Sequence, residues 1–593
     1  MKKTLVLYFS SFSRRKRIIF ALASLLIGFF ASLGYLMSFY DDVYLIPKFI
    51  YIPHVDAGVV ISFIANIISF TLIALLAMIV IDFVSLRIRD HKEKEVEERA
   101  PKKFFWIAAG VLGLAWMPYY LSTYPGGLFY DTFESAWMAQ TMDDYGIRFL
   151  NSHYPVVDAL FLRGIYLFNT EYFPSLKETF IKEGMIDRVV LNSHWSMTDE
   201  MIYAMITAGI VEYIAMVLVM AYVVHWMRKM GLKRWLSYIV LAFIAIFPLF
   251  PLYAVSVWKD TPFNLVLIVF VLTLAEFIFS KGELLKDRKY FRKFILLSIL
   301  LAILRNNGIY ILTVIFAIMA IYLFVKDHAA MFKKHAKFFI LTPMIIISVL
   351  IIHGPVYDRL GFNAKYNTGE MLGIPVRQLA YISFYDYELP EEDQAYLDSI
   401  MGKNFVKKFY APMIADTIKF NNPNLIEGGF DNKVIENDKL KFAVFYLKLW
   451  TMHPKAMIKA YIMATAGFYS PRINNGFGYA QIKPWDDPDF GVYRYDLFEK
   501  MFGFSIYEKI ENMAPISAAY FLFTMIITAA ILWVRKSYAK LIVLIPGFVT
   551  WLTVMIATPV TISLRYVYIL VLMVPVEIYL LTTKRISLKK SED

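Results

Sequence analysis

Long runs of apolar residues recur along the whole chain, and they constrain its fold more than any other feature. Many stretches of eighteen or more residues carry almost no charge, and each can cross a hydrocarbon core roughly 30 Å thick as a helix. Apolar residues make up 59% of the 593, and the mean hydropathy is +0.53. A soluble core does not need so many uncharged runs. The sequence therefore predicts an all-α polytopic membrane protein.

We expect about twelve transmembrane helices from these runs. In chain order they cover residues 17–40, 58–85, 104–121, 201–226, 235–254, 261–280, 292–304, 309–325, 338–354, 514–534, 540–558 and 566–583. Basic residues precede the first run, as in a signal peptide, but its only Ala-x-Ala pattern, Ala21–Ala23, lies at its beginning. Because cleavage there is implausible, we expect an uncleaved first span.

The basic residues indicate the orientation of these spans. If the N-terminus is cytoplasmic, the segments rich in Lys and Arg all fall inside, namely 86–103, 227–234, 281–291, 326–337, 535–539 and 584–590. The positive-inside rule predicts this distribution for short loops. It also accounts for the net charge of +12 without nucleic acid, since no basic patch with a reading motif stands out. We expect a multi-pass protein of the cytoplasmic membrane with both termini inside the cell.

Two long segments between spans fall on the outer side. Residues 122–200 form one, and residues 355–513 are long enough for a folded domain or several amphipathic surface helices. We divide the chain into an N-terminal hairpin with a basic loop, a membrane core with the first outer segment, an extracytoplasmic domain and C-terminal helices with a basic tail, covering 1–100, 101–354, 355–513 and 514–593. The apolar but lysine-interrupted stretch 442–470 is expected at the interface or on the core; a thirteenth span is the alternative.

Six ionisable residues arrive together at the outer face when the spans are threaded in this way. They are Asp131, His153, Lys259, Asp260, Arg305 and Arg565. Ionisable groups at membrane depth are costly unless they line a wet cavity, so they are functional candidates. Their position on one side of the membrane indicates a site. Because the chain has no Cys, disulfides, thiolate metal sites and a Cys nucleophile are excluded.

Asp131 and His153 lie in the first outer segment. Asp131 follows a Pro-Gly-Gly turn after the third span, where its carboxylate can act as a general base or a metal ligand; capping of a helix expected over 131–141 is the alternative. His153 can bind substrate or assist Asp131, or it is an ordinary loop histidine. The pattern around His153 recurs at Asn192–Trp195, and a metal site that combines both histidines with Asp131 or with Asp143 and Asp144 stays open.

The remaining candidates lie at the outer ends of later spans. Lys259 and Asp260 either neutralise each other or bind a phosphorylated, glycosylated ligand. Arg305 is followed by Asn306, Asn307 and Gly308, a break that often marks a re-entrant corner at a cavity. Arg305 and Arg565 either snorkel to headgroups or clamp a phosphate through bidentate guanidinium contacts. In the second outer segment, Arg377 is either a ligand-binding residue or part of ordinary loop packing.

These motifs resemble an uncharacterised bacterial branch of the GT-C glycosyltransferase superfamily. The resemblance rests on Asp131 in a Pro-Gly-containing outer loop, Asn-x-His-x-Pro at 151–155, Lys259-Asp260 and Arg305-Asn-Asn-Gly. It covers roughly residues 100–583, and the first two spans look like an added hairpin. The superfamily's acidic pair is not matched, since Glu134 lies three residues after Asp131 and not beside it.

The resemblance implies a GT-C-like fold and an inverting transfer of a sugar from a polyprenyl-phosphate donor to an extracytoplasmic glycan, glycolipid, teichoic acid or protein. Asp131 would be the base, and His153 would orient the donor or the base. Lys259, Arg305 and Arg565 would stabilise the leaving phosphate, and Asp260, Asn306 and Arg377 would contribute to substrate binding. The partners would be the lipid-linked donor, the acceptor and membrane lipids. A divalent cation, Mg²⁺ or Mn²⁺, stays open as a cofactor.

Two other functions remain as alternatives. A transporter or flippase for a lipid-linked or polysaccharide substrate predicts charges midway along several spans, where Glu212, Glu276 and Glu577 are the exceptions in apolar interiors. A membrane scaffold predicts that Asp131, Lys259, Arg305 and Arg565 do not cluster in three dimensions.

Overall fold

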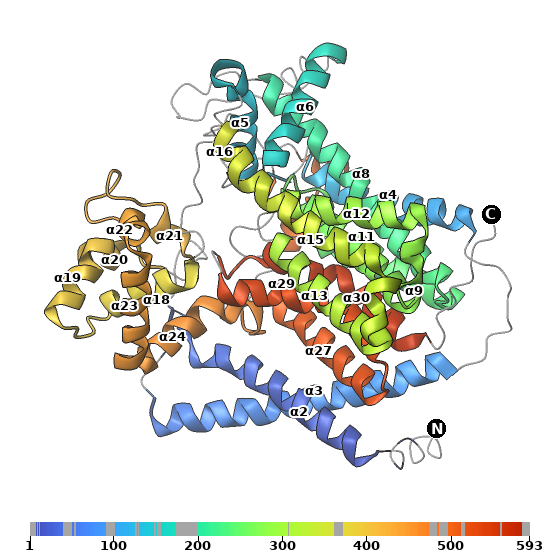
Figure 1. Ribbon diagram of the computed structural model, residues 1–593, viewed down its shortest axis with the longest axis horizontal. Helices are drawn as coiled ribbons and strands as arrows, with labels where there is room; N and C mark the ends of the chain where they lie inside the picture. The colour runs from blue at the N-terminus through green and yellow to red at the C-terminus, as the bar shows by residue number, and fades with distance from the viewer. Residues whose placement is uncertain are drawn as a thin grey trace.

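The computed structural model describes residues 8, 10, 12–39, 50–52, 55–90, 101–124, 127–128, 130–146, 150, 156–173, 199–305, 308–360, 372–473, 483–484, 496–511, 516–557 and 560–583. These residues are mostly helical, as the apolar runs predict (Figure 1). The strands among them form two short antiparallel pairs, β1 (Ser38–Phe39) with β2 (Ile50–Tyr51) and β3 (Gly127–Leu128) with β4 (Lys483–Pro484). The second pair joins the two segments predicted to lie outside the membrane.

The helices follow one another along the chain with short connections. The first group comprises α2 (Arg14–Leu33), α3 (Ala57–Asp90), α4 (Lys102–Ser122), α5 (Tyr130–Tyr145), α6 (Val156–Tyr172), α8 (Asp199–Lys229), α9 (Arg234–Ile246), α10 (Leu249–Ala254), α11 (Asp260–Phe279), α12 (Arg288–Leu304), α13 (Gly308–Asp327), α14 (Met331–Lys334), α15 (Ala336–Ile351) and α16 (Tyr357–Leu360). The second comprises α18 (Gly373–Phe384), α19 (Glu391–Ile400), α20 (Lys403–Phe409), α21 (Asp416–Lys419), α22 (Asn432–Asn437), α23 (Lys439–Met452), α24 (Pro454–Thr465), α25 (Leu497–Phe502), α26 (Ile506–Glu511), α27 (Ala518–Val534), α28 (Tyr538–Val543), α29 (Ile545–Ile556) and α30 (Ile569–Thr582). Short 3₁₀ turns are η1 (Gly34–Leu36), η3 (Glu283–Lys286), η4 (His328–Ala330), η6 (Ala466–Phe468) and η8 (Leu564–Val567), and η5 (Ile352–Val356) is a π-helical turn.

Eight helices of the described residues are long and apolar enough to cross a membrane, and they identify the chain as a multi-pass membrane protein. They are α2, α3, α4, α8, α11, α13, α15 with its continuation through α16, and α30 with η8. Three shorter apolar helices, α9, α27 and α29, lie where three of the other spans are predicted. The predicted span 235–254 is divided into α9 and α10, because Pro248 lacks the N–H that a continuous helix needs.

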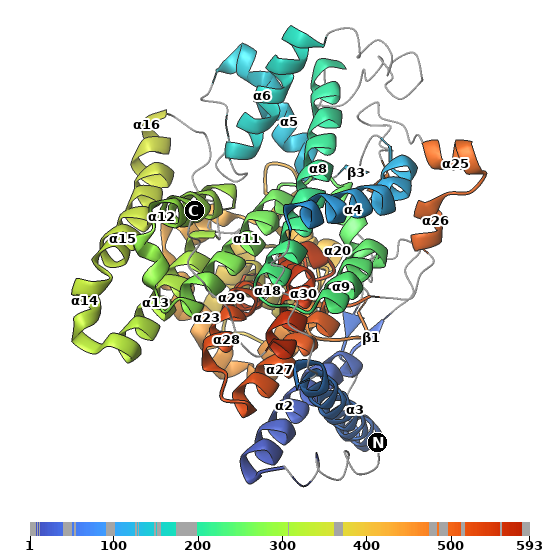
Figure 2. The same ribbon diagram turned by 90° about the vertical axis from the view of Figure 1, so that its right-hand side faces the viewer.

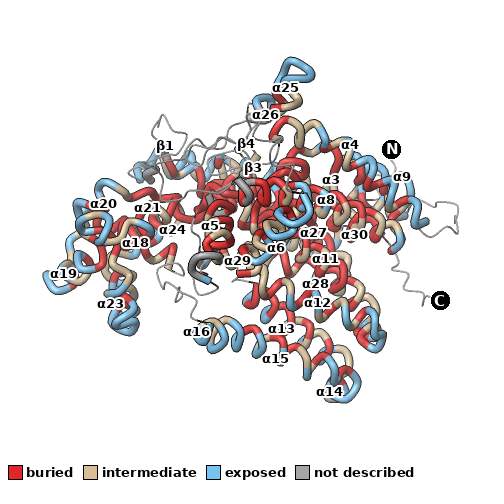
Figure 3. Tube along the Cα trace, turned by 90° about the horizontal axis from the view of Figure 1, so that it is seen from above, coloured by how far each residue is buried: buried red, intermediate tan, exposed pale blue. Residues whose placement is uncertain are grey.

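The central helices of the bundle are α11 and α30. In their most apolar windows 72% and 83% of the residues are buried, against 17% for α3 and for α15. Figure 2 shows α11 and α30 near the middle, with α14 and α15 at one edge and α25 and α26 at the other. Figure 3 shows buried residues concentrated in the same central helices. The helices α3 and α15 therefore leave most of their apolar side chains at least partly exposed.

A separate group of helices, α18 to α24, lies at one end of the bundle (Figure 1). The stretch 442–470, whose alternative prediction was a thirteenth span, is divided there at His453 into α23 and α24, and Pro454 begins the second helix. Neither helix is long enough to cross a bilayer core of roughly 30 Å. Trp551 donates to the carbonyl of Phe468 at 3.2 Å, so the end of this stretch rests on the core.

A buried carboxylate is among the contacts that attach the N-terminal hairpin to the bundle. Asp82 on α3 is 2% exposed and pairs with Lys16 of α2 at 2.6 Å and with Arg535, after α27, at 2.7 Å. Arg535 also donates to the carbonyl of Leu581 at the end of α30, at 2.8 Å. Asp82 thereby joins the predicted added hairpin to two helices of the core.

We predict that Asp82→Asn destabilises the folded protein by about 3–5 kcal/mol, because Lys16 and Arg535 stay buried without a counter-ion. The matched control is Asp90→Asn on the same helix, where the carboxylate is 52% exposed and pairs with Arg89 at 3.2 Å; exposed pairs contribute about 0–1 kcal/mol. The two variants are compared by their midpoints of thermal unfolding in detergent. Equal midpoints for the two variants would contradict the account of the hairpin.

Candidate functional site

The site is built around the turn that leads from α10 into α11. Trp258 and Asp260 are each 1% exposed, and Lys259 between them is half-buried at the start of α11. The backbone N–H of Trp258 donates to the Glu212 carboxylate of α8 at 3.3 Å. A buried carboxylate such as Asp260 requires charged or hydrogen-bonding partners to offset its lost hydration.

Arg305 supplies the first partner of Asp260. It follows α12 in an extended conformation that turns its side chain toward the start of α11, and its Nη1 forms an ion pair with Asp260 Oδ1. The Arg305 guanidinium carbon lies 5.8 Å from the ring centre of Phe263 and 5.3 Å from that of Tyr566. The break after span seven therefore brings a cation into the bundle end, where sequence analysis predicted a cavity corner.

Arg565 supplies the second partner from the opposite end of the chain. Its Nε lies 3.8 Å from Asp260 Oδ2, and its Nη2 donates to the Tyr566 hydroxyl at 2.6 Å. The guanidinium carbon lies 4.8 Å from the ring centre of Trp258 and 4.7 Å from that of Tyr566. The two arginines are 17% and 13% exposed, so both guanidinium groups are drawn into the bundle and do not extend freely toward headgroups.

Several buried polar atoms in this region make no hydrogen bond with the part of the chain that the structure describes. They are Asp260 Oδ2 and the hydroxyls of Tyr253, Thr261 and Ser563. An unsatisfied buried polar group costs about 1–3 kcal/mol. These four atoms lie on Asp260, on the residue after it, on a residue two positions before Arg565, and on the ring that stacks against Trp258. Lys259, Arg305 and Arg565 bring three basic residues to the neighbourhood of Asp260 and Glu212.

An aromatic stack forms the wall beneath the charged groups. The rings of Tyr253 and Tyr568 lie 3.7 Å apart and nearly parallel, and Trp258 stacks on Tyr253 at 6.0 Å. The Tyr568 hydroxyl donates to the carbonyl of Leu249 at 3.1 Å. These stacked rings are buried, so they border the arginines with a low-dielectric setting in which charge acts strongly.

Asp131 lies in the first turn of α5, which confirms a helix at the predicted position. Its side chain lies outside the described part of the structure. The next residue, Thr132, is 4% exposed and donates its hydroxyl to the carbonyl of Val257. Since Val257 directly precedes Trp258, the backbone at Asp131 lies beside the turn that carries Lys259 and Asp260. His153 and Asn306 fall outside the described residues.

Arg377 lies in a different environment from the other candidates. It is fully buried in α18 and donates to the backbone carbonyls of Gly373 at 2.9 Å and Ala464 at 3.1 Å. Burial lowers the pKa of its guanidinium to about 10, so it stays charged at neutral pH. Thr561 also donates its hydroxyl to the Ala464 carbonyl. Arg377 thus supports the segment that leads to Arg565.

Sequence reasoning missed several residues of this site. Tyr253, Tyr566 and Tyr568 occur in apolar runs where nothing distinguishes them from core residues. Glu212 stood out as a carboxylate inside an apolar span, but only the packing of α8 against α11 brings it to the level of the Trp258 turn. Among the described residues no three His, Asp or Glu side chains gather as a metal site would require, and the side chains of Asp131, His153, His194, Asp143 and Asp144 are not among them.

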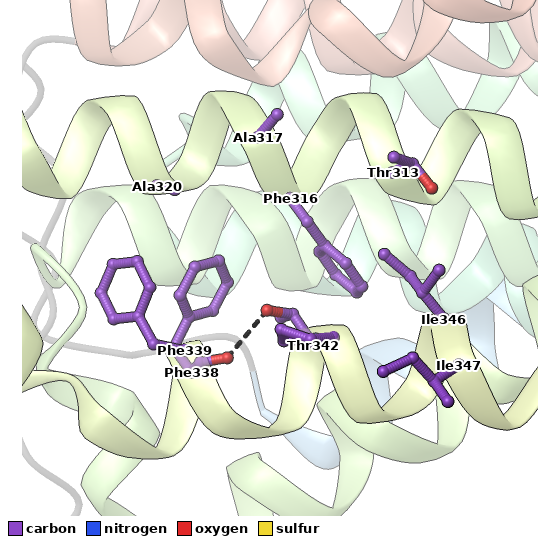
Figure 4. A pocket seen from close by; sticks show the side chains of 10 residues that line it. Thr313, Phe316, Ala317, Ala320, Phe338, Phe339, Thr342, Ile346 and Ile347 are labelled. Atoms are coloured by element: carbon purple, nitrogen blue, oxygen red, sulfur yellow. Dashed lines mark hydrogen bonds between the residues drawn. The ribbon is translucent and has the colours of Figure 1, made fainter.

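An apolar groove of about 350 Å³ lies between α13 and α15 (Figure 4). The small side chains of Thr313, Ala317 and Ala320 form one side, and Phe339, Pro343 and Ile347 lie opposite. The hydroxyl of Thr342, also in the groove, donates to the carbonyl of Phe338 on its own helix at 2.9 Å, which leaves the groove apolar. The groove runs along α13, the helix that begins three residues after Arg305.

Comparison with protein families gives a match over most of the chain. The model of a family of unknown function, DUF6020, matches residues 184–593, a region that contains Glu212, Lys259, Asp260, Arg305 and Arg565 but begins after Asp131. No curated protein and no solved structure matches the chain. Because the family model covers more than half of the 593 residues, the chain belongs to the family of unknown function DUF6020.

Proposed function

We propose that this protein is a membrane glycosyltransferase that moves a sugar from a polyprenyl-phosphate donor to an acceptor of the cell envelope. The observation that carries the proposal is the convergence of Arg305 and Arg565 on buried Asp260. Guanidinium groups bind phosphate oxygens through charge-assisted, often bidentate hydrogen bonds. Two of them meeting at the ends of apolar helices suit a phosphate attached to a lipid.

The unsatisfied polar atoms suit the phosphate and the sugar of such a donor. Hydroxyls of Tyr253, Thr261 and Ser563 can donate to phosphate oxygens or accept from sugar hydroxyls, and Asp260 Oδ2 can only accept. A mixture of cations, hydroxyls and one carboxylate matches a sugar phosphate better than it matches a purely anionic or purely apolar ligand. Asp260 also keeps the two guanidinium groups close together before the donor binds.

In the proposed reaction, Asp131 accepts the proton of the acceptor hydroxyl as that oxygen attacks the anomeric carbon of the sugar. The bond between the anomeric carbon and the phosphate oxygen breaks, and the lipid phosphate leaves with the electron pair. Arg305, Arg565 and Lys259 stabilise the negative charge that builds on it. His153 orients the donor or the base. The position of α5 beside the Trp258 turn supports this arrangement.

The proposal includes twelve spans in a GT-C-like arrangement, both termini in the cytoplasm and a site on the outer side of the cell membrane. The basic loops support this orientation. The donor's isoprenoid chain would lie in the groove between α13 and α15, because a chain there lies along the helix that starts beside Arg305. Helices α18 to α24 would shape the acceptor side.

The contacts of the intramembrane carboxylates favour this function over transport. Glu212 bonds the Trp258 turn, so it belongs to the site and not to a separate pathway. Glu276 accepts from Trp226 at 2.8 Å, and Glu577 accepts from Thr528 at 3.1 Å. The clustering of Asp260, Arg305 and Arg565 also argues against a passive scaffold.

We predict that Asp131→Asn lowers sugar transfer about 10²–10⁴-fold, the usual contribution of a general base, while the protein still inserts and purifies normally. Transfer is measured with purified protein and a panel of polyprenyl-phosphate sugars. The control is Glu134→Gln, one helical turn further along α5, which should retain transfer. Near-normal turnover in Asp131→Asn would remove the base from the mechanism.

Arg305→Ala and Arg565→Ala should each reduce kcat/KM for the lipid-phosphate donor about 10²-fold, because each removes a cation that stabilises the leaving phosphate. Arg359→Ala provides a control, since Arg359 is exposed on α16. Unchanged donor kinetics in both site variants would refute the phosphate clamp.

Ala317→Trp should raise the KM for a long-chain polyprenyl donor severalfold by filling the groove, while a short-chain donor is used as before. Ile321→Trp on the same helix is the control, because Ile321 is 61% exposed and does not line the groove. Equal effects on long and short donors would place the lipid chain elsewhere.

A further inference from the structure

One peptide group beside the site is held from both sides by side chains of two different helices. Its carbonyl, from Val257, accepts the hydroxyl of Thr132 on α5. Its N–H, from Trp258, donates to Glu212 Oε2 on α8 at 3.3 Å. The four residues are 1–7% exposed, so water does not compete for these bonds.

This peptide group connects the two halves of the proposed catalytic arrangement. Thr132 follows Asp131 in the first turn of α5, and Trp258 is followed by Lys259 and Asp260 at the start of α11. A shift of about 1 Å between a base and a bound substrate can cost 10²-fold in rate. Contacts that hold α5 against this turn therefore bear directly on turnover.

We propose that Thr132 and Glu212 are positioning residues. Their hydrogen bonds to the Val257–Trp258 peptide hold Asp131 at a fixed position relative to the phosphate-binding turn. The effect on turnover rests on the proposed function, but the two hydrogen bonds to the peptide belong to the fold. The positioning role accounts for an intramembrane carboxylate that would otherwise indicate transport.

The environment of Glu212 shows which feature of the side chain matters. Asp158 of α6 lies close enough for the two carboxyl groups to interact, and like charges at close range oppose each other. The contact that the structure shows at position 212 is an oxygen that accepts from the Trp258 N–H. A glutamine keeps this oxygen and removes the negative charge.

Hydrogen exchange tests the bond between Trp258 and Glu212 independently of sugar transfer. Amide hydrogen exchange over residues 255–260, measured by mass spectrometry on the full-length protein in detergent, should be about tenfold faster in Glu212→Leu than in the wild type, because one hydrogen bond is lost. Glu212→Gln should exchange like the wild type. Equal exchange in the wild type and Glu212→Leu, or equally fast exchange in Gln and Leu variants, would overturn the proposed bond.

Transfer kinetics with a polyprenyl-phosphate hexose then test whether Thr132 and Glu212 position Asp131. Thr132→Val and Glu212→Leu should lower kcat about tenfold with little change in donor KM, because Arg305 and Arg565 are intact, whereas Thr132→Ser and Glu212→Gln should restore kcat. The double variant should lose less than the product of the single losses, since both bonds hold one peptide. Unchanged kcat in Thr132→Val and Glu212→Leu, or lost kcat without rescue by Ser and Gln, would overturn the positioning role. If the wild type transfers no sugar, the proposed function fails. Hydrogen exchange still shows whether the Trp258 N–H is bonded to Glu212.

Discussion

The arrangement at the end of the bundle depends on the buried carboxylate of Asp260. At 1% exposure it requires cations, and it has Arg305 from the α12–α13 connection and Arg565 from the segment before α30. These residues lie on three different elements of the chain. Their mutual attraction in a setting of low dielectric holds together the ends of helices that lipid alone would not bring into register.

The surrounding structure supports that centre in successive layers. The stack of Tyr253, Trp258 and Tyr568 lies beneath it. Arg377 and Thr561 share the carbonyl of Ala464 and so connect the α18–α24 group to the segment that carries Arg565. A comparable arrangement occurs at Asp82, whose carboxylate pairs with Lys16 of the N-terminal hairpin and with Arg535 of the core. In both places one buried acid organises basic residues from distant parts of the chain.

The sequence predicts helical spans because the bilayer permits few alternatives: every backbone polar group must be bonded within a helix, so uncharged runs of sufficient length become helices. Among the residues that the structure describes, eight of the twelve predicted spans coincide with helices long and apolar enough to cross a membrane, whereas 235–254 and 540–558 are each divided into two helices. It also predicts that Asp260, Arg305 and Arg565 reach one end of the bundle, since alternating spans place their ends on alternating sides. It does not predict which of them touch. That depends on helix rotation and tilt, which packing sets. Arg377 is an example. Its motif suggested ligand binding, but its buried side chain donates to backbone carbonyls. Glu212 is another, because its depth along α8 has meaning only once α11 is placed beside it.

The central claim is that Arg305 and Arg565 receive the phosphate of a lipid-linked sugar. The most direct measurement is an experimental structure of the purified protein with a non-transferable polyprenyl-phosphate sugar analogue. The account predicts the phosphate within hydrogen-bond distance of both guanidinium groups, with the sugar toward the start of α5. A phosphate bound elsewhere, with the Arg305–Asp260–Arg565 cluster unchanged, would contradict it.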